Sequence, residues 1–251
     1  MIHKFPITVP PLTGETTRTG YIYIPDTYDK NQEKRYPVMY MFDGHNVFFD
    51  EDATYGKSWD MAAYLEANPK ELIIIAIECN HDGSCRLSEY SPFDFSYEPF
   101  GEIKAKGKVY MDWLVDTLKP EVDSHLKTLP DRNNTIICGS SMGGLMSLYG
   151  ATVYNKYFSR AACLSPSLWI NPKKLEHMID KSKINQDTCI YMDYGSRELN
   201  NHEKSREILL SSTSLLINKN ANVTLRIIHG GTHSEASWAK QVPVFMECLG
   251  L

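Results

Sequence analysis

The segment around Ser141 carries the residue types of a nucleophile held on a sharp turn. It follows the pattern Gly139-x-Ser141-x-Gly143, with an apolar run before it and helical sequence from Met142 onward. A serine that projects from a strand-to-helix turn needs small neighbours, because larger side chains would collide with adjacent backbone. The pattern therefore predicts Ser141 as a nucleophile. A Gly/Ser turn without a catalytic role is the alternative interpretation.

A serine hydroxyl is a poor nucleophile until an imidazole accepts its proton. Among eight histidines, His233 follows the last predicted strand after the turn Gly230-Gly231. Such a turn can deliver the ring to the carboxyl end of the strand, where open α/β sheets build their sites. His229 is the nearest rival, but it belongs to the strand end itself and could serve only a local hydrogen bond. We therefore predict His233 as the base.

The third member of such a set is a carboxylate that orients the imidazole. Two candidates follow the apolar run at 189–193. Asp193 ends the run and could cap or hydrogen-bond the turn, whereas Glu198 lies in the loop at 194–199. The longer reach of the loop favours Glu198, and Asp193 remains the alternative. A solvated Glu198 paired with Arg197, or capping the next helix, is the non-catalytic interpretation.

Acyl transfer also needs two N–H donors for the tetrahedral oxyanion. The residue after the nucleophile, Met142, would supply one. A second would come from the loop after an earlier strand, and the Asp43-Gly44 turn that follows 38–42 makes the backbone N–H of His45 our candidate. The competing interpretation is a plain Asp-Gly turn.

The elements that would position these residues alternate along the chain. Most of the apolar runs lack polar interruptions, as strands buried on both faces do, which predicts a mostly parallel sheet. The runs are at 21–24, 38–42, 72–77, 135–138, 161–164, 189–193 and 223–228, and the main helical segments are at 58–67, 108–128, 142–154 and 202–217. This alternation is typical of a doubly wound α/β domain.

Two interruptions of this pattern stand out. Pro120 lies inside the helical segment at 108–128 and should kink or divide it. The stretch at 80–101 has no clear period but is rich in aromatic residues, and a loop of that length in a compact domain is more often a functional lid or rim than a tether.

Bulk composition limits the classes of function. The 251 residues suit one α/β domain over 1–251, and the net charge of −5 offers no basic field for nucleic acid. Since no apolar run approaches the length that spans a bilayer and no signal peptide is visible, we expect a cytoplasmic protein without a membrane partner. The six cysteines should be reduced. Only Cys79 and Cys85 lie close enough to raise a disulfide or metal question, and no zinc spacing accompanies them, so no metal is predicted.

With these motifs assembled, the chain resembles the putative-esterase family of α/β hydrolases, which includes enterochelin, feruloyl and acetyl-xylan esterases, formylglutathione hydrolases and mycolyltransferases. The resemblance covers nearly the whole length. It is carried by the segments at 40–44, 86–92, 138–145, 193–198 and 230–238.

The resemblance implies an α/β-hydrolase fold with a mostly parallel sheet of about eight strands and helices on both faces. It also implies Ser141, His233 and Glu198 as a triad, with His45 and Met142 as oxyanion donors. The expected activity is hydrolysis of short-chain or aromatic acyl esters, including acetylated or feruloylated sugars, through an acyl-enzyme without a cofactor. Alternatives are an acyltransferase, a thioester or siderophore-ester hydrolase, and a non-catalytic binding domain. The partner is a small-molecule ester; the oligomeric state is not predicted.

Overall fold

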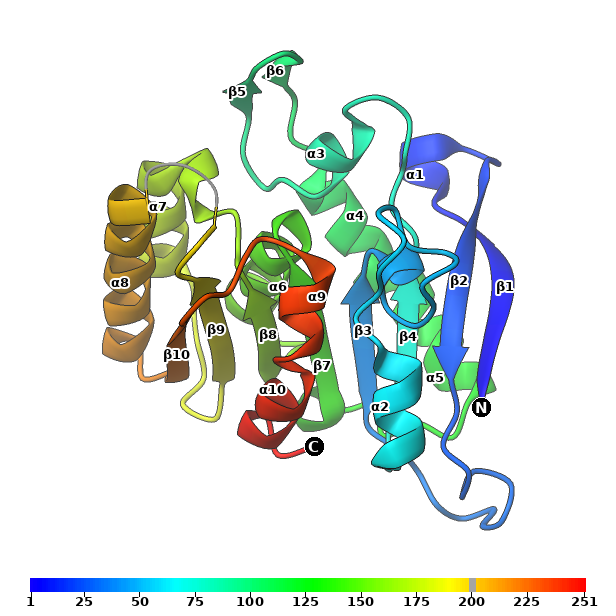
Figure 1. The fold of residues 1–251 in the computed structure, drawn as a ribbon. Helices are drawn as coiled ribbons and strands as arrows, with labels where there is room; N and C mark the ends of the chain where they lie inside the picture. Colours follow the sequence, from blue (N-terminus) through cyan, green and yellow to red (C-terminus); the bar gives the residue numbers. More distant parts are fainter. Residues whose placement is uncertain (199–201) are drawn as a thin grey trace.

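The computed structural model describes residues 1–198 and 202–251, and its centre is an eight-stranded sheet (Figure 1). The order across the sheet is β1-β2-β4-β3-β7-β8-β9-β10. The strands are β1 (Ile2–Thr8), β2 (Thr17–Tyr23), β3 (Val38–Phe42), β4 (Ile73–Ile77), β7 (Thr135–Ser140), β8 (Arg160–Leu164), β9 (Cys189–Gly195) and β10 (Asn222–Ile228).

Six of these strands, from β4 to β10 across the sheet, run parallel to one another, whereas the pairs β1–β2 and β2–β4 are antiparallel. The carboxyl ends of β3, β4, β7, β8, β9 and β10 therefore meet at one edge, the upper one in Figure 1. The mostly parallel sheet expected from the unbroken apolar runs is confirmed.

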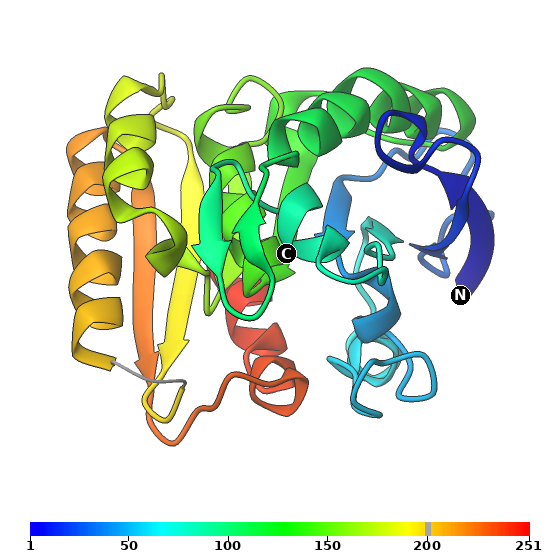
Figure 2. The ribbon, with the colours of Figure 1, turned by 90° about the horizontal axis from the view of Figure 1, so that it is seen from above.

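Helices cover both faces of the sheet (Figure 2). Side chains alternate in direction along each strand, so that Tyr40 and Phe42 enter one core while Met39 and Met41 enter the other. On the first face lie α4 (Gly107–Trp113), α5 (Lys119–His125), α6 (Met142–Thr152), α7 (Pro172–Lys181) and α8 (His202–Asn218). On the second lie α2 (Met61–Ala67), α9 (Glu235–Ala239) and α10 (Val242–Cys248).

Pro120 divides the long helical segment, as the sequence predicted. A π-helical turn, η2 (Leu114–Leu118), separates α4 from α5, and Pro120 is the second residue of α5. Proline has no N–H to donate to the carbonyl one turn earlier, and the wider turn accommodates this missing bond.

Each of the seven predicted apolar runs lies within a strand or extends beyond it by one residue at one end, but the sequence reasoning missed β1. This edge strand contains Pro6 and mixes exposed with half-buried residues, so that neither a continuous nor a strictly alternating pattern marks it. Its short neighbour α1 (Pro10–Thr13) was also missed.

The stretch at 80–101 is more ordered than its sequence suggested. It contains α3 (Cys85–Glu89) and the strand β5 (Phe95–Tyr97), which pairs with β6 (Gly101–Ile103). Figure 1 places α3 and this hairpin beyond the carboxyl edge of the main sheet. Arg18 and Glu89 form a buried bidentate ion pair, with N–O distances of 2.9 and 2.8 Å. This pair fixes α3 to β2.

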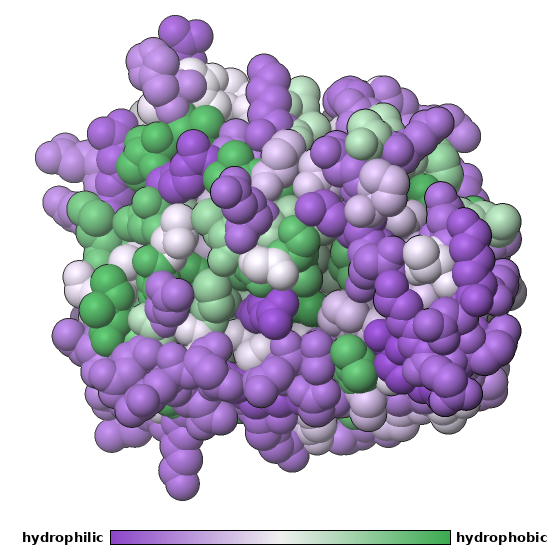
Figure 3. Space-filling model, turned by 90° about the horizontal axis from the view of Figure 1, so that it is seen from below, coloured by the Kyte–Doolittle hydropathy of each residue, from purple (hydrophilic) through white to green (hydrophobic). Residues whose placement is uncertain are grey.

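The end of the molecule opposite the carboxyl edge of the sheet has hydrophilic residues around its rim and hydrophobic residues between them (Figure 3). Within the described residues, no helix is both long and apolar enough to cross a membrane.

Candidate active site

The turn between β7 and α6 holds Ser141 in a strained conformation. Its φ of 56° and ψ of −118° lie where side chains other than glycine are rare. The glycines two residues away make this turn possible, since a Cβ on Gly139 would stand 2.6 Å from the backbone of Gly143. Strain of this kind concentrates at functional sites. Asp43 and Ser165, at the ends of neighbouring strands, also have positive φ.

Helix α6 begins directly after the serine. Met142 is its first residue, so its amide has no acceptor within the helix and points out of the N-terminus. The Ser141 hydroxyl lies 3.4 Å from the hydroxyl of Ser167. Within the parts of the chain that the structure describes, no hydrogen bond joins it to the His233 ring.

His233 and Glu198 are brought together by the loops after β10 and β9. The distance from His233 Nδ1 to Glu198 Oε2 is 3.0 Å. The other carboxylate oxygen accepts a 2.6 Å hydrogen bond from the backbone N–H of Gly195. Glu198 is buried, so its carboxylate is held in one orientation against the ring. Leu199, the last residue of the predicted acid loop, lies outside the described residues.

Close packing of two glycines sets the spacing of these loops. A Cβ on Gly195 would stand 2.4 Å from the carbonyl oxygen of Gly231. The same carbonyl accepts a 2.8 Å hydrogen bond from the backbone N–H of Arg197. The acid loop and the histidine loop are therefore joined through their backbones.

Asp193, the alternative acid, has different partners. It is buried within β9, where its carboxylate accepts hydrogen bonds from the backbone N–H of Ser165 at 3.0 Å and the Tyr191 hydroxyl at 2.9 Å. Burial raises the pKa of Asp193 to about 7. It shares no hydrogen bond with the His233 ring, which bonds Glu198 instead.

The rival histidine is also separated from the site. His229 is exposed and lines neither of the two cavities that contain Ser141, whereas His233 lines both.

The turn that carries His45 is fixed by an ion pair that sequence reasoning did not assign. Asp43 accepts two hydrogen bonds of 2.7 Å from the Arg86 guanidinium. Burial acts to raise the pKa of Asp43, but the adjacent guanidinium outweighs it and holds that pKa below its usual value. The pair connects α3 to the short 3-10 helix η1 (Gly44–Asn46), where the amide of His45 lies near its start.

The His45 ring lies in a buried position. Its Nε2 is 3.0 Å from Thr54 Oγ1, and its ring centroid is 4.5 Å from that of His81. Burial lowers the pKa of His45, which favours the neutral ring.

Two cavities meet at the nucleophile. The first, of about 420 Å³, is lined by Ser141, His233, His45 and Glu235 among others. The second, of about 660 Å³, also includes Ser141 and His233 and extends over Leu168, Trp169, Tyr97 and Ile208. The nucleophile candidate thus stands between one more polar and one more apolar space.

Trp238, which belongs to α9, is buried. Its indole Nε1 donates a 2.9 Å hydrogen bond to Ser165, and its ring packs edge-on against His233 with centroids 5.0 Å apart. Ser165 was missed altogether, although it directly follows the apolar run at 161–164. A polar residue at the carboxyl end of a predicted parallel strand was the available signal.

Solved structures share this fold across the whole chain. An IroE-like serine hydrolase from Shewanella oneidensis superposes with a TM-score of 0.74 at 18% identity, covering 100% of this chain and 88% of that one. A ferulic acid esterase superposes with a TM-score of 0.66 at 14% identity, covering 99% of this chain and 98% of that one. The enterobactin esterase FES from Shigella flexneri gives 0.73 at 15% identity, covering 100% of this chain but 58% of its own. The fold is that of the α/β hydrolases.

Sequence comparison gives the family. The Uncharacterized protein YbbA from Bacillus subtilis (strain 168) is 22% identical over 195 residues, which cover 76% of this chain and 73% of that protein. A sequence model described as Putative esterase matches residues 13–246. The chain therefore belongs to the Putative esterase family and is a carboxylic ester hydrolase.

Proposed function

We propose that Ser141, His233 and Glu198 form the catalytic triad of a serine esterase. Its single domain would span residues 1–251, and the amides of His45 and Met142 would be the oxyanion donors. The observation that carries the proposal is the strained Ser141, which lines the same two cavities as a His233 ring held by Glu198. Each of these groups follows the carboxyl end of a parallel strand, where such sheets bind ligands.

The proposed reaction starts with attack of Ser141 Oγ on the ester carbonyl, while His233 Nε2 accepts the hydroxyl proton. Glu198 keeps the ring in the tautomer with hydrogen on Nδ1 and stabilises the imidazolium that forms. His233 then protonates the leaving alcohol. Water, activated by the same ring, attacks the acyl-serine and releases the acid.

The hydroxyl must turn towards His233 for this reaction. In the structure it lies beside Ser167, and rotation about one side-chain bond changes its direction without moving the backbone. Catalytic hydrogen bonds are often long or absent before substrate binds and tighten in the complex.

We further propose an acyl group that is short or aromatic. The larger cavity has an exposed aromatic surface. Trp169 and Tyr97 both line it with their ring centroids 5.5 Å apart, and Trp169 is 45% exposed. Aromatic rings stack on such surfaces. One solved structure of similar fold is a ferulic acid esterase, whose name denotes an esterase for an aromatic acid. Small-molecule esters are the proposed substrates.

The test uses Ser141→Ala with p-nitrophenyl acetate and p-nitrophenyl butyrate. We expect kcat to fall by roughly 10³-fold or more, because the covalent route is lost. Ser167→Ala is the matched control, since its hydroxyl lies in the same cavity 3.4 Å away, and it should still be labelled by a fluorophosphonate probe. Retained labelling of Ser141→Ala, or its loss in Ser167→Ala, would overturn the assignment.

A further inference from the structure

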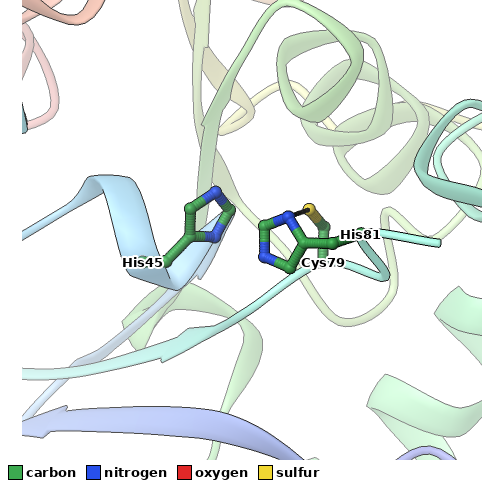
Figure 4. A group of neighbouring side chains, drawn as sticks. All are labelled: His45, Cys79 and His81. Atoms are coloured by element: carbon green, nitrogen blue, oxygen red, sulfur yellow. Dashed lines mark hydrogen bonds between the residues drawn. The ribbon is translucent and has the colours of Figure 1, made fainter. Parts of the chain in front are cut away.

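Three side chains with metal-binding atoms lie close together (Figure 4). One ligand atom each from His45, Cys79 and His81 lies within 4.8 Å of the others, and all three residues line the cavity of about 420 Å³. The residues follow β3 and β4, which are neighbours in the sheet and run parallel. Their carboxyl ends therefore deliver the three side chains to one place.

In both imidazole rings, Nε2 already has a hydrogen-bond partner. His45 Nε2 lies 3.0 Å from Thr54 Oγ1, and His81 Nε2 lies 3.0 Å from Glu78 Oε1. When Nε2–H donates to an oxygen, the lone pair remains on Nδ1. This is the arrangement that orients metal-binding histidines, whose second nitrogen usually bonds a carboxylate or another oxygen.

The Nδ1 atom of His45 is buried and has no hydrogen-bond partner among the described residues. The side chain is 4% exposed. In Figure 4 one nitrogen of its ring faces His81 and Cys79. A buried acceptor without a partner is costly, and few are left so without a reason. The neighbouring His81 Nδ1 lies 4.0 Å from Cys79 Sγ.

We propose that His45, Cys79 and His81 form a three-ligand site for Zn²⁺, with the fourth coordination position open to the cavity that contains Ser141. Two imidazole nitrogens and one thiolate are a donor set that zinc prefers, and an open fourth position is typical of zinc sites that exchange a ligand. On binding, the Zn²⁺–sulfur bond forms as the thiol S–H bond breaks, and the proton leaves to solvent.

The geometry requires a small contraction. Zinc lies about 2.0–2.1 Å from nitrogen and about 2.3 Å from sulfur, so the two nitrogens and one sulfur of a tetrahedral site stand about 3.3–3.6 Å apart. The present limit of 4.8 Å exceeds this by about 1 Å. His81 can supply the movement, because its side chain is 50% exposed, whereas Cys79 is 2% exposed.

The surrounding charges permit a cation. Arg86 lines the same cavity, but Asp43 pairs with its guanidinium through two hydrogen bonds of 2.7 Å. The thiolate and the Glu78 carboxylate add negative charge at the ligands themselves. Zinc binding is independent of the triad, and it can be measured in the Ser141→Ala protein whether or not the proposed esterase chemistry holds.

The experiment titrates the full-length Ser141→Ala protein with Zn²⁺ by calorimetry and with Co²⁺ by absorption spectroscopy. We expect one ion per chain, a thiolate-to-cobalt charge-transfer band, and visible bands of the intensity that four-coordinate cobalt gives. Cys79→Ser should abolish the charge-transfer band, and both Cys79→Ser and His81→Gln should weaken Zn²⁺ binding by roughly 10-fold or more.

Two control variants keep the result specific. Cys85→Ser removes a thiol from the same region, and His229→Gln removes an exposed imidazole; both should bind as the parent does. His81→Gln alters a half-exposed side chain and should fold even if loss of the buried thiol does not allow Cys79→Ser to do so. Absence of one-to-one binding, or undiminished binding in folded Cys79→Ser or His81→Gln, would overturn the proposal.

Discussion

The indole of Trp238 and the hydroxyl of Ser165 are joined by a hydrogen bond of 2.9 Å from Nε1 to Oγ. Ser165 Oγ in turn donates to Glu198 Oε1 at 2.5 Å. Since Glu198 also bonds the His233 ring, a chain of contacts runs from the core beneath α9 to the proposed base. Trp238 is therefore placed to position the acid rather than to bind substrate by its polar edge.

Replacing Trp238 by phenylalanine should slow the enzyme without unfolding it. The change keeps an aromatic ring but removes the donor to Ser165, which costs about 1 kcal/mol of stability. We expect kcat to fall by roughly 10-fold, since Ser165, which donates to the Glu198 carboxylate, loses the donor that orients its hydroxyl. Trp59→Phe is the control, because the Trp59 ring lies in the same core, with its centroid 6.2 Å from that of Trp238. Equal kinetic effects in both variants would contradict a specific role for the Ser165 contact.

Glu198→Gln should lower kcat for p-nitrophenyl acetate by roughly 10²- to 10⁴-fold, because an amide cannot stabilise the imidazolium. Asp193→Asn should cost far less, since Asp193 bonds Ser165 and Tyr191 rather than the imidazole. Steady-state kinetics of the two variants decide between the acids. The reverse ranking would make Asp193 the triad member.

Asp193 should make stability fall as pH rises from about 4 to about 7. Burial raises its pKa from 3.8 to about 7, so the folded state binds more protons than the unfolded state in that window. The effect is at most about 4 kcal/mol, present below the window and lost above it. Urea unfolding at several pH values compares the wild type with Asp193→Asn, whose stability should depend less steeply on pH in this direction. Parallel curves would show that Asp193 does not titrate there.

Gly195→Ala should damage both folding and activity. The new Cβ would lie 2.4 Å from the Gly231 carbonyl oxygen, and the two loops would have to separate, which moves Glu198 away from His233. We expect a loss of roughly 2 kcal/mol or more in unfolding free energy. Gly230→Ala is a matched control with a φ of 73° but open space around its Cβ, so it should show only backbone strain of about 1–2 kcal/mol. A smaller loss in Gly195→Ala than in this control would refute the role of close packing.

Trp169→Ala should change substrate preference. Its ring lines the larger cavity with Tyr97, and we expect KM for a feruloyl ester to rise by roughly 10-fold while acetate hydrolysis is nearly unchanged, because stacking on one aromatic face is worth about 1 kcal/mol. Tyr55→Ala removes an exposed aromatic ring from the other cavity and should not discriminate between the two esters. An equal rise in KM for the feruloyl ester and the acetate ester would show that the larger cavity does not recognise the acyl group.

The sequence by itself determined seven of the eight strands of the main sheet, four of the helical segments along the chain, and the positions of the nucleophile and base candidates. Unbroken apolar runs mark strands buried on both faces, and the glycines around Ser141 mark a turn that larger residues cannot make. These signals are local, so they survive without coordinates. The edge strand β1 escaped because its burial pattern is irregular.

Only the tertiary structure decided which distant residues touch. Glu198 and Asp193 lie in one short segment, and their separate partners depend on how the loops after β9 and β10 pack at Gly195 and Gly231. The grouping of His45 with Cys79 and His81 likewise follows from the adjacency of β3 and β4. Spacing along the chain could not reveal it, because strand order in the sheet, not separation in sequence, fixes which loop ends are neighbours.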